Sequence, residues 1–489
     1  MTSLYRVNYQ LRAHKRDPLI EFMKAMLLTP FVLHSPNTTH TTTNTTTTNT
    51  TNTTPHSTNT ASTMSTIVQS TNESEHDSAQ ADYAEILSRL ELLIEHHRRM
   101  EQQGSPHLSQ LYRLVPSIGS FFTPLPLKQA FLIQDARVKL SARRFVPPSF
   151  NDIRRILNTA QIMAIQKQLQ LITFDGDMTL YADGASFTHD AYLVQLLTTL
   201  LQHDLFVAIV TAAAYGPSPF AYERRLSGLL DGFRAAHLTP QQLSRFYVLG
   251  GECNYLFQCS EQARLVYINA MQVKGLPEWN EDQVGRVLDT AQHALQQCLH
   301  RMNLKARILR KQKAVGLIPL PGATLQREQL DECVLTVQQR VNEVNAGKRV
   351  HVSSPSIPTF TSEQGVDPTA PHDLFQDHVV LQKNHGCTDQ QEPGLPFCAF
   401  NGGSDVWVDV GNKLIGVHVL QHHLGTLPET TLHVGDQFLS TGNDFATRSA
   451  CCTLWIVNPE ETASALQELI QQLDEGKESE ENQETSEEA

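Results

Sequence analysis

Two carboxylates, Asp175 and Asp177, stand two residues apart directly after the apolar run Leu169–Phe174. An apolar run of this length followed by Gly predicts a buried strand, and open α/β sheets bind their ligands at the carboxyl ends of such strands. If the chain stays extended, the two side chains point to the same side. One carboxylate can then act as a nucleophile and the other as a proton carrier, which suits phosphoryl transfer with a divalent cation.

Three further pieces of the chain carry matching chemistry. Thr211 ends a second apolar run, 205–210, and its hydroxyl can donate to a phosphate oxygen. Lys413 is expected to open a helix and to supply a positive point charge. Asp436 and Asp444 are expected in a loop after a strand, and hard oxygen ligands of this kind suit Mg²⁺.

A cation has a clear task in such a site. An attacking carboxylate about 3 Å from a phosphate charge meets a repulsion of roughly 5 kcal/mol per charge pair at an effective dielectric constant of about 20. Mg²⁺ and Lys413 would offset this repulsion, as phosphoryl transfer requires. Each piece alone is typical of a turn, a cap or a surface residue. Their common placement at strand ends and helix starts favours a single site.

The elements that position these residues alternate between strand and helix. This alternation predicts a doubly wound parallel α/β sheet, assigned to residues 166–215 and 400–472. The expected strands are 169–174, 205–210, 431–434 and 453–457, and the expected helices are 188–203 and 414–424.

The segment between the two halves of this sheet, residues 216–399, has a different pattern of expected secondary structure. It predicts an inserted α+β cap domain with short strands, two amphipathic helices and a long loop at 351–394. The strands are expected at 246–249, 264–268 and 314–318, and the helices near 281–303 and 326–346.

Residues 1–165 predict a helical N-terminal region, with helices at 18–33, 81–103 and 150–169. The Thr/Asn-rich tract at 37–75 cannot bury enough apolar area and is expected to be disordered. The acidic tail 473–489 is expected to be disordered as well.

Composition narrows the class of protein. The 489 residues suggest about three domains, and much of the net charge of −13 comes from the tail, so nothing favours nucleic-acid binding. We expect no membrane span, since no stretch of 18 residues is continuously apolar. The eight cysteines lack the spacing of a zinc site and the N-terminus lacks a secretory signal, which together predict reduced thiols and a cytoplasmic protein.

The order strand-DxDxT, strand-Thr, Lys and GD…D resembles the four motifs of the haloacid dehalogenase superfamily. Seven residues separate Asp436 from Asp444, more than in the commonest forms, which leaves the role of Asp444 open. A closer resemblance is to the IMP-specific 5′-nucleotidase family, and it covers nearly the whole chain. The segments that carry it are 173–181, 249–257, 400–409 and 435–438, with a similar opening through Leu33.

The resemblance implies hydrolysis of IMP to inosine and phosphate. Asp175 would be the nucleophile that forms an aspartyl-phosphate, and Asp177 would protonate the leaving 5′-oxygen and then activate water. Thr211 and Lys413 would hold the phosphate. Asp183 would contact the substrate. The resemblance also implies a homotetramer that ATP activates through an effector site in the N-terminal region.

By the same resemblance, Mg²⁺ would be held by Asp175, the backbone carbonyl of Asp177 and Asp436. Asp444 is a further candidate beside the metal.

Selectivity for hypoxanthine has a physical basis. Hypoxanthine offers a donor at N1 and an acceptor at O6, adenine reverses both, and such a mismatch can reject a substrate by roughly 10⁴-fold. Trp407 and Phe445 could stack on the purine base, but core packing would explain these two side chains equally well. Arg448 could contact the phosphate or the ribose, or it could form an ion pair at the surface. The candidates are the carboxylates Asp183, Asp405 and Asp409, the rings of Trp407, Phe445 and Tyr181, the cation Arg448, and Arg144, Arg154 and Arg155 for the effector.

Two other functions fit parts of the pattern. A sugar-phosphate phosphatase or phosphomutase of the same superfamily would share the catalytic motifs and differ in substrate. A non-catalytic nucleotide sensor is expected to lack one of Asp175, Asp177, Lys413 or Asp436, and all four are present.

Overall fold

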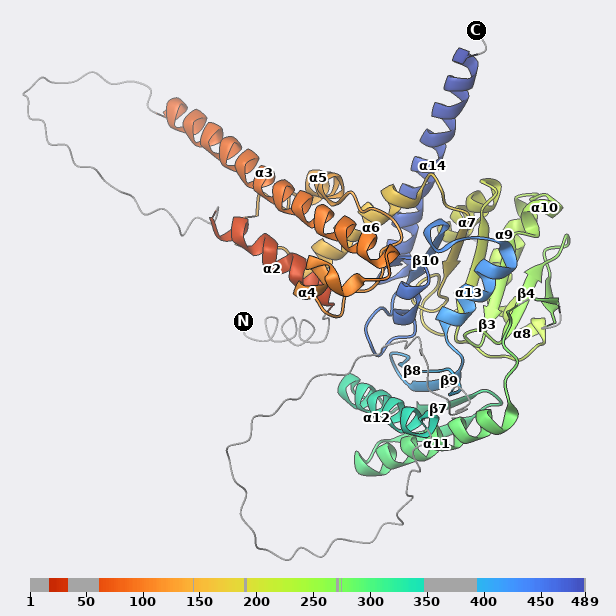
Figure 1. Cartoon of the computed structure of the whole chain (residues 1–489). Helices are drawn as coiled ribbons and strands as arrows, with labels where there is room; N and C mark the ends of the chain where they lie inside the picture. The colour runs from red at the N-terminus through yellow and green to blue at the C-terminus, as the bar shows by residue number, and fades with distance from the viewer. Residues whose placement is uncertain are drawn as a thin grey trace, which may run out of the picture.

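The structure is a computed structural model. It describes residues 17–33, 61–143, 145–188, 191–269, 272–273, 275–346 and 394–487. Three parts are visible in Figure 1: a helical N-terminal unit, a seven-stranded sheet flanked by helices, and a smaller four-stranded sheet with two helices. In the described part of the chain, no helix combines the length and apolarity needed to cross a membrane.

The seven-stranded sheet positions the site. Its strands, in spatial order, are β11 (Cys452–Trp455), β10 (Thr431–Gly435), β1 (Leu171–Phe174), β2 (Phe206–Thr211), β3 (Phe246–Gly250), β4 (Tyr255–Cys259) and β5 (Leu265–Ile268). The first five run parallel, which confirms the predicted parallel α/β architecture. β4 and β5 are antiparallel additions at one edge, a feature that was not expected.

Helices cover both faces of this sheet because successive strand residues point to opposite sides. On one face, Phe174 of β1 belongs to a core shared with α7 (Tyr192–Gln202), α9 (Ser227–Ala235) and α14 (Pro459–Glu487). On the other face, Leu171 belongs to a core shared with α13 (Lys413–Leu424). The shorter helices on this unit are α8 (Pro219–Arg225), α10 (Pro240–Leu243), η4 (Pro428–Thr430) and η5 (Phe445–Ser449).

The N-terminal unit consists of α2 (Pro18–Leu33), α3 (Ala61–Gln102), η2 (Pro106–Leu108), α4 (Gln110–Leu114), α5 (Leu127–Val138) and α6 (Phe150–Ile165). Ser149 and Asp152 form a capping box that starts α6. The apolar core of this unit includes Phe438 and Trp455 of the sheet unit. The helices therefore pack directly against the segment that follows β10.

The second sheet is antiparallel throughout, in the order β6 (Ala306–Arg310), β7 (Ala314–Pro319), β9 (Val406–Val410) and β8 (Phe397–Asn401). The helices α11 (Glu281–Arg301) and α12 (Arg327–Asn345) share its apolar core. Figure 1 shows this unit beside the central sheet, joined to it through β9 and α13.

The expected boundaries of the inserted unit were wrong at both ends. β3, β4 and β5 lie inside the predicted insertion 216–399 but belong to the seven-stranded sheet. β9 and the last two residues of β8 were expected in the catalytic core, which was predicted to resume at 400, but both strands belong to the smaller sheet. A buried apolar strand has the same local pattern in either sheet, so pattern alone does not assign it.

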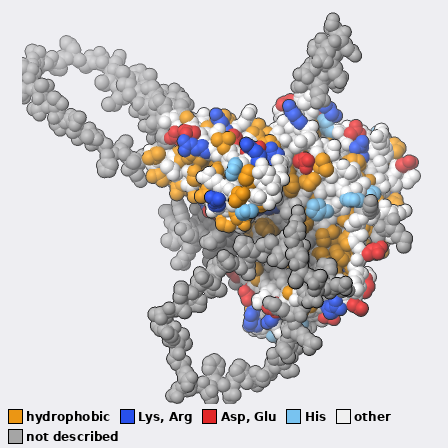
Figure 2. Space-filling view, viewed as in Figure 1, with side chains coloured by type: hydrophobic (Ala, Val, Ile, Leu, Met, Phe, Trp, Pro, Cys, Tyr) orange, Lys and Arg blue, Asp and Glu red, His pale blue; other side chains and the backbone are white. Residues whose placement is uncertain are grey.

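Two predictions of disorder were also wrong in part. Residues 61–75 of the Thr/Asn-rich tract lie in α3, whereas 37–60 fall outside the described residues. The tail 473–487 continues α14, because its Glu, Gln and Lys residues favour helix strongly. The predicted loop 351–393 also falls outside the described residues. On the face shown in Figure 2, basic and acidic side chains are interspersed over the described surface.

Candidate active site

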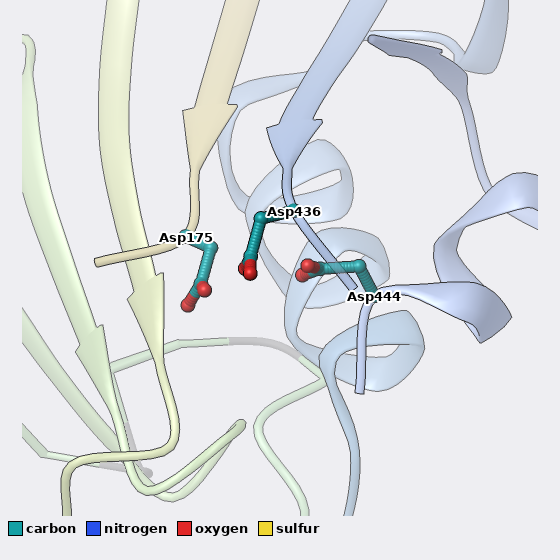
Figure 3. A group of neighbouring side chains, drawn as sticks. All are labelled: Asp175, Asp436 and Asp444. Atoms are coloured by element: carbon teal, nitrogen blue, oxygen red, sulfur yellow. The ribbon is translucent and has the colours of Figure 1, made fainter. Parts of the chain in front are cut away.

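Three carboxylates converge at the carboxyl edge of the central sheet. Asp175 follows β1, Asp436 follows β10 and Asp444 precedes η5, and Figure 3 shows their oxygen atoms pointing toward one another. One ligand oxygen from each lies within 4.8 Å of the others. The backbone N–H of Asp175 donates to the Val434 carbonyl at 2.9 Å, which continues the β1–β10 pairing and brings both strand ends to one place.

Lys413 completes this cluster, and its side chain is 0% exposed. Its Nζ lies 2.6 Å from Asp175 Oδ1 and 2.7 Å from Asp444 Oδ1. Burial alone would lower the pKa of Lys413, but Asp175 and Asp444 outweigh burial and raise it, so the amine is charged. The chain approaches closely here because Gly411 has φ +85° and a Cβ there would lie 2.2 Å from Cys253 Sγ.

Asp444 is held in place from several sides. His433 Nε2 lies 3.0 Å from Asp444 Oδ1, and the other ring nitrogen lies 2.8 Å from Thr173 Oγ1. The backbone N–H of Gln437 donates to Asp444 Oδ2 at 2.9 Å. Burial would raise the pKa of Asp444, but Lys413 and His433 outweigh it and hold that pKa well below its usual range. The residue whose role the sequence left open therefore lies at the centre of the cluster.

The donor set fits a divalent cation. Burial raises the pKa of Asp175 to about 7, although Lys413 opposes the shift. Burial, followed by the charge of Asp175, raises the pKa of Asp436 well above its usual range. Asp436 Oδ1 is buried, and the described residues offer it no hydrogen-bond partner. An unpartnered buried oxygen among three carboxylates is what a hard cation with oxygen ligands would satisfy.

Thr211 lies beside the loop that joins the first two acids. A Cβ placed on Gly176 would lie 3.4 Å from Thr211 Oγ1 and 2.4 Å from the Tyr181 hydroxyl oxygen. Thr211 Oγ1 accepts a hydrogen bond from the Ala213 N–H at 3.1 Å, which leaves its own hydrogen free to donate. The role of Thr211 in holding a phosphate oxygen stays a prediction.

The side chain of Asp177 lies outside the carboxylate cluster. Asp177 Oδ1 accepts from the Gly184 N–H at 3.0 Å and forms an ion pair with Arg225. The Arg225 guanidinium carbon lies 5.0 Å from the centre of the Tyr181 ring. Tyr181 is buried and packs edge-on against Phe187, so its ring serves packing as well as any contact with a base.

Comparisons with known proteins place the chain in a family. The chain matches the IMP-specific 5′-nucleotidase family over residues 1–466. It belongs to that family. An IMP-specific 5′-nucleotidase 1 of Emericella nidulans is 40% identical over 96% of this chain and 98% of its own length.

Two solved structures are also similar to this member of the IMP-specific 5′-nucleotidase family. An IMP-bound mutant of the Plasmodium falciparum IMP-nucleotidase has a TM-score of 0.70 at 29% identity, over 94% of this chain and 97% of that one. An ATP-bound form of the Plasmodium protein has a TM-score of 0.63 at 33% identity, over 79% of each chain.

Some of the predicted substrate residues of this nucleotidase-family chain lie where the smaller sheet meets the central one. Trp407 Nε1 donates to Asp405 Oδ2 at 2.9 Å, and Lys311 Nζ lies 4.2 Å from the centre of the Trp407 ring. Burial raises the pKa of Asp405, and the charge of Asp183 raises it further. Burial also raises the pKa of Asp183, with Asp177 adding to the shift. The loop after β1 and the β8–β9 hairpin therefore act on each other electrostatically.

Asp409 and Glu252 form a second buried acidic pair beside the cluster. Burial, followed by the charge of Glu252, raises the pKa of Asp409 well above its usual range. Glu252 is 0% exposed, has φ +64° and accepts from Asn443 Nδ2 at 3.1 Å, and burial raises its pKa to about 7. Asp409 Oδ1 and Glu252 Oε2 find no hydrogen-bond partner among the described residues. Sequence reasoning missed Glu252 and Lys311, although the segment 249–257 was a signal for the first.

Arg448 faces the N-terminal unit. Arg448 Nη1 lies 2.5 Å from Asp17 Oδ2, just before α2. The Arg448 guanidinium carbon lies 5.3 Å from the Phe438 ring centre, 5.5 Å from Trp455 and 5.7 Å from Phe445. The ion pair and these three aromatic contacts account for Arg448 without a substrate, so its contact with phosphate or ribose stays a prediction.

The proposed effector arginines differ in their surroundings. Arg154 is buried, donates to the Trp455 carbonyl and lies 2.7 Å from Glu461 Oε1. Arg155 Nε lies 3.5 Å from the same oxygen. Arg144 falls outside the described residues. In this geometry Arg154 ties α6 to the end of β11 and to α14, so the structure accounts for it without an effector.

Proposed function

We propose that this protein is a Mg²⁺-dependent 5′-nucleotidase that hydrolyses IMP to inosine and phosphate. The observation that carries the proposal is the buried cluster in which Lys413 Nζ lies 2.6 Å from Asp175 and 2.7 Å from Asp444, in a chain that belongs to the IMP-specific 5′-nucleotidase family. The Plasmodium relative bound to IMP supports the same substrate.

The reaction proceeds in two displacements at phosphorus. A carboxylate oxygen of Asp175 bonds to phosphorus while the bond to the 5′-oxygen of IMP breaks, and Asp177 gives that oxygen its proton. Inosine leaves, and Asp177 takes a proton from a water molecule that attacks the aspartyl-phosphate. Phosphate leaves and Asp175 is regenerated. Thr211 and Lys413 hold the phosphate oxygens during both steps.

Asp175, Asp436 and the backbone carbonyl of Asp177 would hold Mg²⁺, with the carboxylate of Asp444 beside them. When bound, Mg²⁺ supplies the positive charge that offsets repulsion between the Asp175 carboxylate and the phosphate.

The purine is read where the two sheets meet. Asp183, Asp405 and Asp409 are the carboxylates that could accept from N1–H of hypoxanthine, and Trp407 and Phe445 offer rings for stacking. The electrostatic link between Asp183 and Asp405 supports this location. Lys311 joins the set, because its Nζ lies 4.2 Å from the Trp407 ring centre.

Regulation and assembly extend the proposal. We assign ATP the role of an activator, supported by the ATP-bound Plasmodium relative. We also propose a homotetramer, supported by apolar side chains left exposed on the N-terminal helices, such as Leu28, Leu33 and Leu92. A cytoplasmic location, expected from the cysteine spacing, belongs to the same proposal. Light scattering of the purified protein tests the assembly, and a monomer would contradict it.

A phosphate-release assay tests the function. The protein is assayed with IMP, GMP, AMP and hexose phosphates, with and without Mg²⁺ and ATP. We expect IMP to be preferred, EDTA to abolish release, Mg²⁺ to restore it and ATP to increase it. Preference for a hexose phosphate would favour the sugar-phosphate phosphatase or phosphomutase. Nucleotide binding with no phosphate release would favour the sensor.

The variant Asp175→Asn tests the nucleophile. It keeps the shape of the side chain but cannot form the aspartyl-phosphate, so we expect phosphate release to fall by roughly 10⁴-fold or more while the fold persists. Near-normal turnover by this variant would rule out Asp175 as the nucleophile.

A further inference from the structure

The carboxylate of Asp177 is fixed through one of its two oxygens. Oδ1 accepts from the Gly184 N–H at 3.0 Å and also pairs with the guanidinium of Arg225. The described residues give Oδ2 no hydrogen bond. One oxygen is therefore anchored to the protein, while the other is left to exchange a proton.

Arg225 connects this carboxylate to the loop around it. Its Nη1 donates to the Tyr215 hydroxyl at 2.8 Å, its guanidinium carbon lies 5.0 Å from the Tyr181 ring centre, and its carbonyl accepts from the Phe187 N–H at 3.1 Å. The loop that begins at Tyr181 and ends at Phe187 is thus tied to the last residue of α8.

Arg225 also has a buried hydrogen-bond donor that is left unsatisfied, and folding alone does not explain this cost. Its Nε is buried, and the described residues provide no hydrogen-bond partner for it. Buried donors are nearly always satisfied in folded proteins, and an unsatisfied one marks a residue held in place for another reason. The ion pair with Asp177, a residue of the active-site loop, supplies that reason.

We propose that Arg225 is the positioning residue for proton transfer in this active site. It holds Oδ1 of Asp177 so that Oδ2 presents its proton to the 5′-oxygen of the leaving nucleoside. As the O–P bond breaks, the bonding pair stays on the 5′-oxygen and the proton moves to it from Oδ2. In the second displacement the attacking water returns a proton to Oδ2. The inference rests on the proposed function, and Arg225 itself touches no reacting atom.

The physical gain is entropic. A carboxylate anchored at one oxygen loses the rotational freedom that would otherwise have to be removed at each turnover.

The first test is Arg225→Met assayed on IMP, with Arg224→Met as the matched control. Arg224 is the adjacent arginine of α8 and is exposed. We expect Arg225→Met to lower kcat by about 10- to 100-fold and to change KM by less than about threefold, within the range of general acid catalysis. The control should stay within about twofold of the native protein. Equal kcat values for the two variants would overturn the proposal.

A double-mutant cycle separates positioning from a structural role. If Arg225 acts through Asp177, then Asp177→Asn combined with Arg225→Met should be no slower on IMP than Asp177→Asn alone. If the losses multiply, Arg225 acts independently and the proposal fails. Thermal unfolding of each variant shows whether the fold has changed.

A second substrate separates this inference from the proposed function. The phenolate of p-nitrophenyl phosphate leaves without a proton, so in Arg225→Met the value of kcat/KM, which covers the steps up to release of the leaving group, should fall at most a few-fold on this substrate while it falls about 10- to 100-fold on IMP. Equal losses on both substrates would overturn the positioning role and leave the nucleotidase intact. Failure of the native protein to release phosphate from IMP would overturn the proposed function instead.

Discussion

The buried end and the rim of the site are built differently. At the buried end, Lys413 and Asp444 are 0% exposed and joined at 2.7 Å, and His433 supports them from the core. At the rim, the ion pair of Asp177 and Arg225 is 35% and 17% exposed, and its neighbours belong to loops and a short helix. One region is buried at the end of the sheet, and the other is carried by loops and a short helix.

This difference assigns phosphoryl transfer to the buried end of the site, and proton transfer and base recognition to the rim. The phosphoryl end exists before a substrate arrives, so it should treat all phosphomonoesters alike. The proton carrier and the base-reading residues lie at the rim, where the loop after β1 meets the β8–β9 hairpin. Changes at the buried end should therefore reduce every activity together, whereas changes at the rim should depend on the leaving group or the base.

The largest effect in this comparison is expected from Lys413→Met. It leaves the buried carboxylates Asp175 and Asp444 without their cation, which should lower the free energy of unfolding by about 3–5 kcal/mol. Activity should fall by more than about 100-fold on IMP and on p-nitrophenyl phosphate alike. Thermal unfolding and phosphate release measure the two effects. If Lys413→Met unfolded at the same temperature as the native protein, Lys413 would not be needed to stabilise the buried carboxylates, and this prediction would be wrong.

A smaller effect at the buried end is expected from His433→Leu. This change removes the ring nitrogen that lies 3.0 Å from Asp444 Oδ1, and groups that orient metal ligands typically contribute 10- to 100-fold to metal affinity. We therefore expect the Mg²⁺ concentration needed for half-maximal activity to rise by about 10- to 100-fold. His433→Gln, which can still donate a hydrogen bond, is the matched control and should lose less. Equal Mg²⁺ requirements in both variants and the native protein would separate His433 from the metal.

Much of the buried end could be predicted from sequence because its residues are tied to local signals. Asp175 and Asp436 each follow an apolar strand, and Lys413 begins a helix. Parallel pairing of the two strands then brings the acids together without further information. The central place of Asp444 was not predicted, because the spacing from Asp436 shows proximity in sequence but not which oxygen meets Lys413.

The rim was less predictable, because its contacts join distant parts of the chain. Arg225 is 48 residues from Asp177, and nothing in its local pattern distinguishes it from a surface arginine. Arg154 was expected in an effector site, yet it pairs with Glu461, 307 residues away. Glu252 has the local pattern of a turn, and only the fold shows that it is buried beside the cluster.

The pH dependence should report on the buried end. Burial raises the pKa of Asp175 to about 7, so below that pH the nucleophile becomes protonated and kcat/KM should fall. A bound cation favours the ionised form, and raising Mg²⁺ should therefore move the acidic limb to lower pH by roughly one unit. The measurement is kcat/KM on IMP against pH at low and saturating Mg²⁺. A limb that moves to higher pH with Mg²⁺ would contradict this assignment.

The smallest effect is expected at the rim from Tyr215→Phe. The change removes the hydroxyl that accepts from Arg225 Nη1 at 2.8 Å but leaves the ion pair with Asp177 and the contact with Tyr181. Loss of one partly exposed hydrogen bond should lower kcat on IMP by about two- to fivefold. Tyr192→Phe, at an exposed position on α7, is the control. If Tyr215→Phe lowered kcat as much as Arg225→Met does, the position of Arg225 would depend on this single hydrogen bond. The rim would then be as sensitive to a small change as the buried end.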